Sequence, residues 1–238
     1  MIRTAASELR SFLKCAPAIF WSKLIRRRAI KAYLANTDSP KLHIGCGPHR
    51  LDGWLNTDVD TRNGAVYLNA TKPLPFPSNT FECIFSEHMI EHIPIRAAQE
   101  FIAECARVLK PGGVLRIATP DMAFLFALWD SKDSRITEPY IMNAARHFRG
   151  YPRLANKCTT INNFFYNWGH CFIYDEQTLA HLMTANHLQR IERADVGESR
   201  IAALQGVEKH GLSISDEFNR METMILEGTK PLETPLAF

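Results

Sequence analysis

Several patterns that mark common protein classes are absent from this sequence. The six cysteines include no C-x-x-C pair and no spacing typical of a zinc ribbon. Cys46, Cys83 and Cys105 lie in apolar stretches of the kind that form a core. We therefore expect reduced thiols in a cytoplasmic protein and no disulfide framework.

The glycine-rich turn at Gly45 lacks two phosphate-binding patterns. The third glycine of the dinucleotide fingerprint G-x-G-x-x-G would fall at Arg50, and no Lys-Ser or Lys-Thr pair follows the turn. Both absences point away from a pyrophosphate ligand and toward a cofactor with a ribose but no phosphate.

Size and charge predict one main domain with a basic extension. The 238 residues can form one α/β core with a cap, and the 46% hydrophobic and 22% charged content is ordinary for a globular protein. Residues 1–34 carry eight basic residues and one acid, whereas the rest of the chain carries 20 basic and 24 acidic residues. We expect a helical extension at residues 1–36 and the main domain at residues 37–238.

Residues 4–34 predict a helix interrupted at Pro17, and two interpretations of it stay open. The longest uncharged run of this segment, Cys15 to Ser22, is too short to span a bilayer, and the basic run follows the apolar part, unlike in a signal peptide. The helix either packs on the core with a solvated basic face or forms a peripheral anchor on the anionic inner face of a membrane.

A glycine turn joins two predicted strands. Residues 41–44 alternate like a strand that enters a core, and Gly45 and Gly47 let the backbone turn sharply and approach a ligand. A second strand at residues 54–60 places Asp58 at its tip, where an acid typically binds the hydroxyls of a ribose. Only about seven residues join these strands, too few for a parallel crossover, so we expect a loop there.

Apolar strands then alternate with amphipathic helices. We predict strands at residues 66–70, 81–87, 114–119, 188–194 and 221–226, and helices at residues 95–109, 121–130 and 175–185, the first ended by the Lys110 to Gly113 turn and the last by Asn186 in a left-handed conformation. This alternation predicts a doubly wound parallel sheet with the strand tips at residues 45, 58, 87 and 120 along one edge.

Residues 131–174 interrupt this pattern and are expected to be irregular. No acid occurs between residues 139 and 174, where basic residues and histidines stand among aromatic ones. Long insertions over strand tips are usually lids or substrate sites. We therefore interpret this segment as a substrate-side insertion between the fifth and sixth strands.

The ordered motifs KLHIGCG, GWLNTDVD, KPLPFPSNTFECIFSEHMIEHI and ARVLKPGGVLRIATPD resemble the class I methyltransferases that use S-adenosylmethionine. The resemblance is strong over residues 41–121 and thinner through GHCFIYDEQTLAHLM and GESRIAALQGVEKHG. It implies a Rossmann-like seven-stranded sheet whose last strand is antiparallel. It also implies a cofactor over the strand tips, bound by Gly45, Cys46, Gly47, Asp58, Asn69, Ser86 and Glu87, with Asn69 where many relatives have an acid.

Methyl transfer requires alignment of donor and acceptor and, for a hydroxyl, removal of a proton. His88, at a strand tip, is our first candidate for the general base; alternatively, it only orients the following turn. His170 is the second candidate, with the alternative that it shapes the pocket. Asp121 could hold the acceptor, yet it also fits a helix N-cap, and one carboxylate can do both.

Metal and nucleic acid are not expected ligands. Residues 88–92 match H-x-x-E-H, a zinc-peptidase pattern, but Pro94 follows where that motif needs a long helix and a further acidic ligand. The fifth strand ends in Thr-Pro-Asp instead of the Asn/Asp-Pro-Pro-aromatic sequence of base methyltransferases, and four basic residues in the insertion are a small footprint for a phosphate backbone.

We therefore predict an S-adenosylmethionine-dependent O-methyltransferase for a small-molecule or glycan acceptor, which could be anionic. A glycan is favoured because enzymes resembling this group often accompany surface-polysaccharide biosynthesis. The alternative is an S-adenosylmethionine-binding protein that has lost catalysis and acts as a partner or regulatory subunit, for which Asn69 is the only support.

Overall fold

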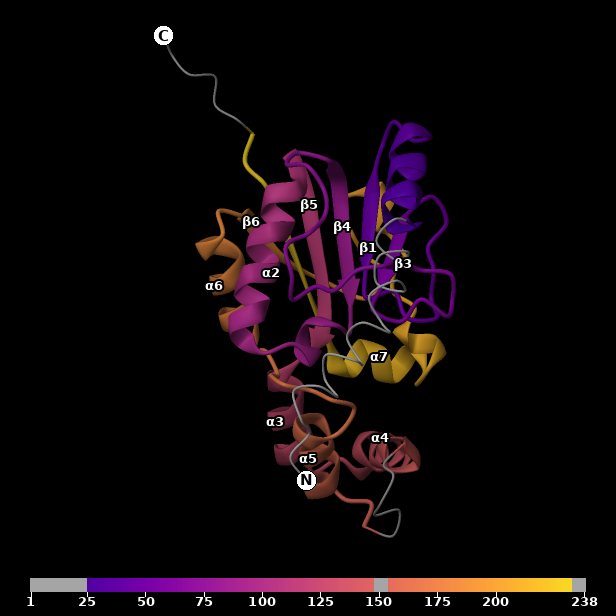
Figure 1. Ribbon diagram of the computed structural model, residues 1–238. Helices are drawn as coiled ribbons and strands as arrows, with labels where there is room; N and C mark the ends of the chain where they lie inside the picture. The colour runs from indigo at the N-terminus through magenta and orange to yellow at the C-terminus, as the bar shows by residue number, and fades with distance from the viewer. Residues whose placement is uncertain (1–24, 148–153, 233–238) are drawn as a thin grey trace, which may run out of the picture.

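The computed structural model describes residues 25–147 and 154–232 of the chain. A seven-stranded sheet in the order β3-β2-β1-β4-β5-β7-β6 forms its centre (Figure 1). Its strands are β1 (Lys41–Ile44), β2 (Leu55–Asp58), β3 (Val66–Tyr67), β4 (Phe81–Glu87), β5 (Leu109–Pro120), β6 (Gln189–Ala194) and β7 (Thr223–Thr229). The pairs from β3 to β5 are parallel, and β7 is antiparallel to β5 and β6. The predicted fold class, with its antiparallel last strand, is confirmed.

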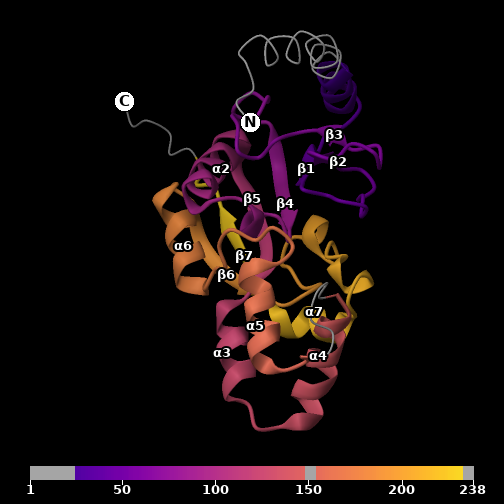
Figure 2. The same cartoon turned by 60° about the horizontal axis from the view of Figure 1, so that its bottom comes forward.

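The described helices fall into two groups, beside the sheet and beyond its strand tips. Helices α2 (Ile95–Val108) and α6 (Glu176–Ala185) contact each other and pack beside the sheet. A lobe of α3 (Met122–Asp130), α4 (Ser134–His147) and α5 (Lys157–Tyr166) lies beyond the arrow ends of β4 and β5, with α7 (Asp216–Glu222) between it and the sheet (Figures 1 and 2). The connection from β1 to β2 contains no helix, as predicted.

The two faces of the sheet are covered by different kinds of structure. Successive residues of a strand point to opposite faces, so Ile84 joins the core that includes Phe101 and Ile102 of α2, whereas Phe85 joins a smaller core with Leu204. That second core lies under the loop at residues 195–210. A long loop with the short helix η2 (Ala202–Leu204) therefore covers this face in place of an α-helix.

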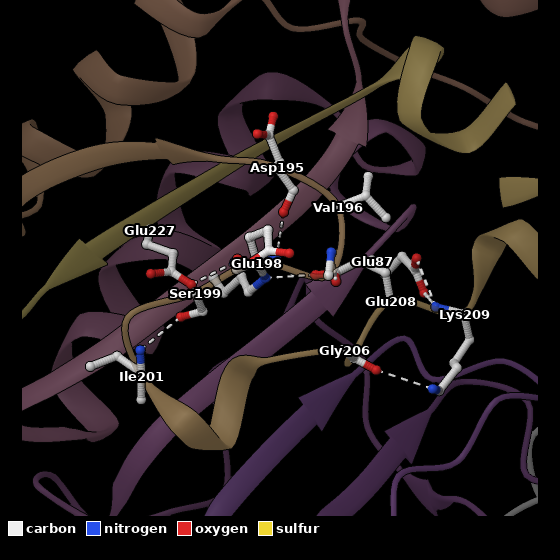
Figure 3. A network of polar contacts seen from close by, with 12 residues as sticks. Glu87, Asp195, Val196, Glu198, Ser199, Ile201, Gly206, Glu208, Lys209 and Glu227 are labelled. Carbon is white, nitrogen blue, oxygen red and sulfur yellow. Dashed lines mark hydrogen bonds and ion pairs between the residues drawn. The ribbon is translucent and has the colours of Figure 1, made fainter. Parts of the chain in front are cut away.

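A buried arginine fixes the loop at residues 195–210 to the sheet. The fully buried guanidinium of Arg116 on β5 lies 2.6 Å from carboxylate oxygens of both Glu208 and Glu227 and donates to the carbonyl oxygen of Glu198 at 2.8 Å. Figure 3 shows the loop side of this network. Loss of one partner from a buried ion pair typically costs about 3–5 kcal/mol, so this network strongly restrains the loop.

The segment expected to be irregular is largely helical. Helices α4 and α5 lie within it, and their apolar side chains form a third core with α3 that includes Leu125, Tyr140 and Phe164. The prediction was wrong because α4 contains Pro139 and α5 is rich in asparagine and threonine, all poor helix formers. Packing against α3 and a capping box at Asn156 stabilise helical structure that the local helix propensity does not favour.

Other details also differ from prediction, among them the bounds of β3 (Val66–Tyr67, predicted 66–70) and β7 (Thr223–Thr229, predicted 221–226). Helix α7 was missed because its buried residues, Asn219 and Glu222, are polar and leave no apolar periodicity. The turn predicted to stop α2 at residues 110–113 is instead the start of β5. After α6, the left-handed residue is His187, with φ 64°, and not Asn186.

The described part of the N-terminal segment packs on the domain. Residues 25–35 are helical, Ile30 is buried, and the Tyr33 hydroxyl donates to the carbonyl oxygen of Lys41 at 3.0 Å. Residues 1–24, which include most of the predicted anchor, lie outside the described residues. Within the described ranges, no helix combines the length and apolarity needed to cross a membrane.

A buried histidine on β1 couples the fold to pH. His43 is 2% exposed and its Nδ1 lies 3.2 Å from Asn56 Oδ1. Burial lowers the pKa of His43 from 6.5 to about 4, although the Asn56 contact opposes the shift. Because this pKa is lower in the folded state, the unfolded chain binds the proton first as the pH falls, and stability is lost between about pH 6.5 and pH 4.

We predict that His43→Leu flattens this dependence. Between about pH 7.5 and pH 5, the wild-type chain should lose about 2 kcal/mol more unfolding free energy than the variant does. Urea denaturation of both chains at the two pH values measures the difference, which cancels the contributions of the other histidines. Equal losses in the two chains would show that His43 is not the responsible group.

Candidate active site

The loop after β1 has the backbone of a ligand cradle. Gly45 and Gly47 both have positive φ, 74° and 49°, a conformation that suits glycine. The amides of Gly45 and Cys46 both donate to the carbonyl oxygen of Thr57, at 2.9 and 3.1 Å, which ties the loop to β2. Burial raises the pKa of the Cys46 thiol to about 11, so this thiol is not a nucleophile at neutral pH.

Asp58 stands at the tip of β2 beside this loop. One carboxylate oxygen accepts from the Gly47 amide at 2.8 Å and the other from the Asp60 amide at 2.7 Å. These contacts orient a half-exposed carboxylate at the sheet edge, as the ribose-binding prediction requires. The loop and the acid therefore lie together, although ribose binding itself stays a prediction.

The other residues predicted to bind the cofactor have varied surroundings. The Asn69 oxygen accepts from the amide and the hydroxyl of Thr71, at 2.9 and 2.8 Å. Ser86 is buried, and its hydroxyl has no hydrogen-bond partner among the described residues. The Glu87 carboxylate accepts from the amides of Lys209 and His210, at 2.9 and 3.0 Å, and so positions the end of the covering loop (Figure 3).

A cavity of about 380 Å³ lies between the strand tips and the helical lobe. The ends of β4 and β5 and the short helix η1 (Ile90–His92) form one side, and α4, α5, α7 and the 210–214 segment form the rest. Its lining is aromatic and rich in imidazole and carboxylate: His88, Glu91, His92, Tyr140, Phe164, Trp168, His170, His210 and Glu222. Two of the three residues predicted for catalysis, His88 and His170, line it.

Both nitrogens of the His88 ring already have partners. Nε2 lies 3.0 Å from the Thr223 hydroxyl, which donates its own hydrogen to Asn219, and Nδ1 lies 3.3 Å from Oε1 of the buried Glu91. Burial opposes a positive charge on His88, but the contact with Glu91 and its charge outweigh burial and raise the pKa of His88. His88 therefore favours the charged form and is poorly placed to accept another proton.

His170 has the opposite arrangement. Its Nδ1 lies 2.7 Å from the carbonyl oxygen of Phe164, so this nitrogen carries the hydrogen and the Nε2 lone pair is left available. Burial lowers the pKa of His170, although the charge of Glu91 opposes the shift. A neutral imidazole with one free nitrogen thus lines the cavity, and its ring lies in a T-shaped contact with the ring of His92.

Tyr140, His210 and Glu222 were not singled out from the sequence. The Tyr140 hydroxyl donates to Glu222, His210 Nε2 lies 3.5 Å from the other oxygen of Glu222, and the His210 ring stacks on His88 with centroids 3.7 Å apart. Burial and the charge of Glu222 raise the pKa of Tyr140. These residues come from three distant segments, so no local spacing could have joined them.

Asp121, the third candidate, lies outside the cavity lining. One oxygen accepts from the Ala123 amide at 2.8 Å, which makes Asp121 the N-cap of α3, and the other pairs with Arg193 at 2.7 Å. The N-cap interpretation is confirmed. A role in holding the acceptor stays a prediction that these contacts do not favour.

Comparison with known proteins finds similarity to methyltransferases. Residues 56–117 match the family described as "Methyltransferase domain". Over 63 residues the chain is 36% identical to a probable S-adenosylmethionine-dependent methyltransferase of Mycolicibacterium smegmatis, a match that covers 26% of this chain and 22% of that relative. A SAM-dependent methyltransferase from Archaeoglobus fulgidus shares the fold, with a TM-score of 0.50 and 14% identity over 88% of this chain and 94% of that one.

The matched segment and the shared fold both agree with the resemblance of the sequence motifs to the class I S-adenosylmethionine-dependent methyltransferases, although the family match spans only residues 56–117 and the chain spans about a fifth of the length of the curated relative. S-adenosylmethionine is the cofactor of this class. The described residues fit it, because the positive-φ glycines allow a close approach at β1 and the Asp58 carboxylate stands half-exposed at the tip of β2.

Gly45 has a steric as well as a conformational requirement. A Cβ atom there would lie 2.5 Å from Cγ of Met89, whereas one at Gly53, which has nearly the same φ, would meet nothing within 4 Å. We predict that Gly53→Ala costs about 1–2 kcal/mol of unfolding free energy from strain alone and that Gly45→Ala costs clearly more. Adding Met89→Ala to Gly45→Ala should recover only part of the extra cost in urea denaturation, because Cβ of Met89, 2.7 Å from the added atom, remains in alanine. Equal costs for Gly45→Ala and Gly53→Ala would contradict the contact.

Proposed function

We propose that this protein transfers the methyl group of S-adenosylmethionine to a hydroxyl of a small-molecule or glycan acceptor. The observation that carries the proposal is the cavity at the carboxyl ends of β4 and β5, beside the β1 loop, with histidines and carboxylates at its floor and aromatic rings on its wall. Ligands of doubly wound sheets bind at this edge. An acceptor held there lies on the same side as a cofactor over the strand tips.

The lining favours a neutral acceptor over an anionic one. Among the described residues, the cavity is lined by two carboxylates, Glu91 and Glu222, and by no lysine or arginine. Lys157 of the insertion donates instead to the carbonyl oxygens of Trp129 and Ser131. Phe164 and Trp168 offer ring faces on which a sugar can stack, which supports the glycan proposal.

In the proposed reaction the acceptor oxygen displaces the sulfur in line. The carbon–sulfur bond breaks and its electron pair stays on sulfur, a carbon–oxygen bond forms, and the hydroxyl proton leaves. His170 is the better candidate to activate the hydroxyl, because its Nε2 is available while both ring nitrogens of His88 have partners. His88 then serves as a positioning residue that holds Glu91.

The cofactor premise is tested by calorimetry. The full chain should bind S-adenosylmethionine, and Asp58→Ala should weaken binding by at least ~10-fold, because hydrogen bonds to a charged group typically contribute about 1.5–3 kcal/mol. Asp60→Ala, which removes the neighbouring acid that pairs with Arg62 instead, is the matched control and should bind normally. Absence of binding by the wild-type chain would reject the proposal.

Activation is tested with labelled cofactor and a panel of sugar and small hydroxyl acceptors. His170→Gln should lower kcat/KM for methyl incorporation by ~100-fold or more, the usual range for loss of proton removal, with cofactor binding unchanged. A variant as active as the wild-type chain would exclude His170 from activation. The alternative function, a cofactor-binding protein without catalysis, predicts binding with no methyl incorporation into any acceptor.

A further inference from the structure

One group of side chains in the cavity has properties beyond those needed for a general base. Nitrogen and oxygen ligand atoms of Glu91, His92 and His170 all lie within 4.8 Å of one another. His92 Nε2 is 4.0 Å from Glu91 Oε1. Glu91 and His92 belong to the H-x-x-E-H sequence, but its first histidine, His88, is not in this group, and the fold supplies His170 from the end of the insertion instead.

A buried oxygen that accepts no hydrogen bond from the described residues lies at the centre of this group. Glu91 is 0% exposed, and its Oε1 has an ion-pair contact with His88 Nδ1 at 3.3 Å that lies outside hydrogen-bonding geometry. His88 therefore offsets part of the cost of burying this charge but supplies no hydrogen bond to Oε1. A cation bound at this atom would offset the rest.

The surrounding contacts orient two of the three ligand residues, His170 and Glu91. The Nδ1–H group of His170 donates to the Phe164 carbonyl oxygen and leaves Nε2 as the ligand atom. The other Glu91 oxygen accepts from the Thr119 hydroxyl at 3.0 Å. Ligating histidines and carboxylates in metalloproteins have such outer partners, which fix the tautomer and the ring orientation.

We propose that Glu91, His92 and His170 bind a divalent transition-metal ion of the zinc type in the acceptor cavity. Two imidazoles and one carboxylate form a known ligand set that leaves coordination positions open. Ligand atoms on a tetrahedral ion with bonds of ~2.1 Å lie ~3.4 Å apart, so modest side-chain rotations would close the site from its present spacing. The open position faces the cavity, where an oxygen of the acceptor can bind.

The neighbouring group of His88, His210 and Glu222 is the weaker candidate, although its ligand atoms are also within 4.8 Å of one another. The two rings are stacked, with an angle of 23° between their planes. Imidazole binds a metal in the plane of its ring, and one ion cannot lie in both planes. Glu222 also already accepts from Tyr140.

With its Nε2 on the ion, His170 would hold the metal and would not itself accept the hydroxyl proton, so this role replaces the general-base role proposed for it. A hydroxyl bound to a divalent ion loses its proton to solvent more readily, because the ion stabilises the alkoxide. The alkoxide then attacks the methyl carbon, and sulfur keeps the electron pair. This role in activation rests on the proposed function, whereas ion binding does not.

The test uses the full chain, stripped with a chelator and titrated with Co²⁺ as a visible probe and with Zn²⁺ followed by elemental analysis. We expect one equivalent of either ion and a Co²⁺ absorption spectrum of four- or five-coordination. His92→Gln and His170→Gln should each weaken binding by more than ~10-fold, the lower end of what loss of an outer partner alone costs. Circular dichroism confirms that each variant is folded.

Two controls locate the ion. His181→Gln changes an exposed histidine on α6 and should bind as the wild-type chain does. His210→Gln should also retain the ion, and its loss there but not in His170→Gln would move the site to the other group and overturn the proposal. Absence of stoichiometric binding by the wild-type chain would overturn it outright.

Calorimetry with S-adenosylmethionine on the stripped and loaded chains separates the two proposals. Cofactor binding without metal binding would reject the ion and leave the methyltransferase proposal intact. Metal binding without cofactor binding would reject the methyltransferase proposal and leave the ion-binding proposal intact. In the loaded chain, methyl incorporation should fall on chelation and return on addition of Zn²⁺, and activity that is unchanged by chelation would exclude a role of the ion in activation.

Discussion

The central sheet and the helical lobe both depend on one buried residue, Glu91, and its carboxylate charge. One of its oxygens accepts from Thr119 on β5, and its backbone carbonyl oxygen accepts from the amides of Cys171 and Phe172 at the end of the insertion. A charge buried this deeply costs several kcal/mol unless it is paired, and His88 is its nearest described cation. Because the same residue joins the sheet to the lobe, both the shape of the cavity and the charge on its sheet side depend on Glu91.

The relative positions of the β1 loop and Asp58 could be predicted because they depend on local structure, although ribose binding there stays a prediction. The β1 loop and Asp58 are separated by a few residues of a glycine turn and one strand, so strand periodicity alone brings them to the same sheet edge. The structure places them in contact through the Gly47 amide. The N-cap at Asp121 was predictable for the same reason, since a cap acts within one helical turn.

The acceptor half could not be assembled from the sequence, because it depends on long-range packing. Tyr140 and Glu222 meet only because α4 and α7 both pack over the strand tips. No sequence pattern in either segment indicates this contact. Helices α4 and α5 carry poor helix formers and become helical through their shared core with α3. The H-x-x-E-H motif was visible, but its interpretation depended on a residue that only the fold brings beside it.

The charged residues that line the cavity constrain what can occupy it. Glu91 and Glu222 face a space lined by no lysine or arginine among the described residues, so the compensating charge comes from imidazolium groups or from a bound cation. The contact with Glu91 and its charge outweigh burial and raise the pKa of His88, whereas burial lowers the pKa of His170. Such a cavity attracts a sulfonium or a metal ion more strongly than a neutral thioether. In the proposed methyl transfer, loss of the sulfonium charge would weaken the attraction between the spent cofactor and these acids and favour its exchange.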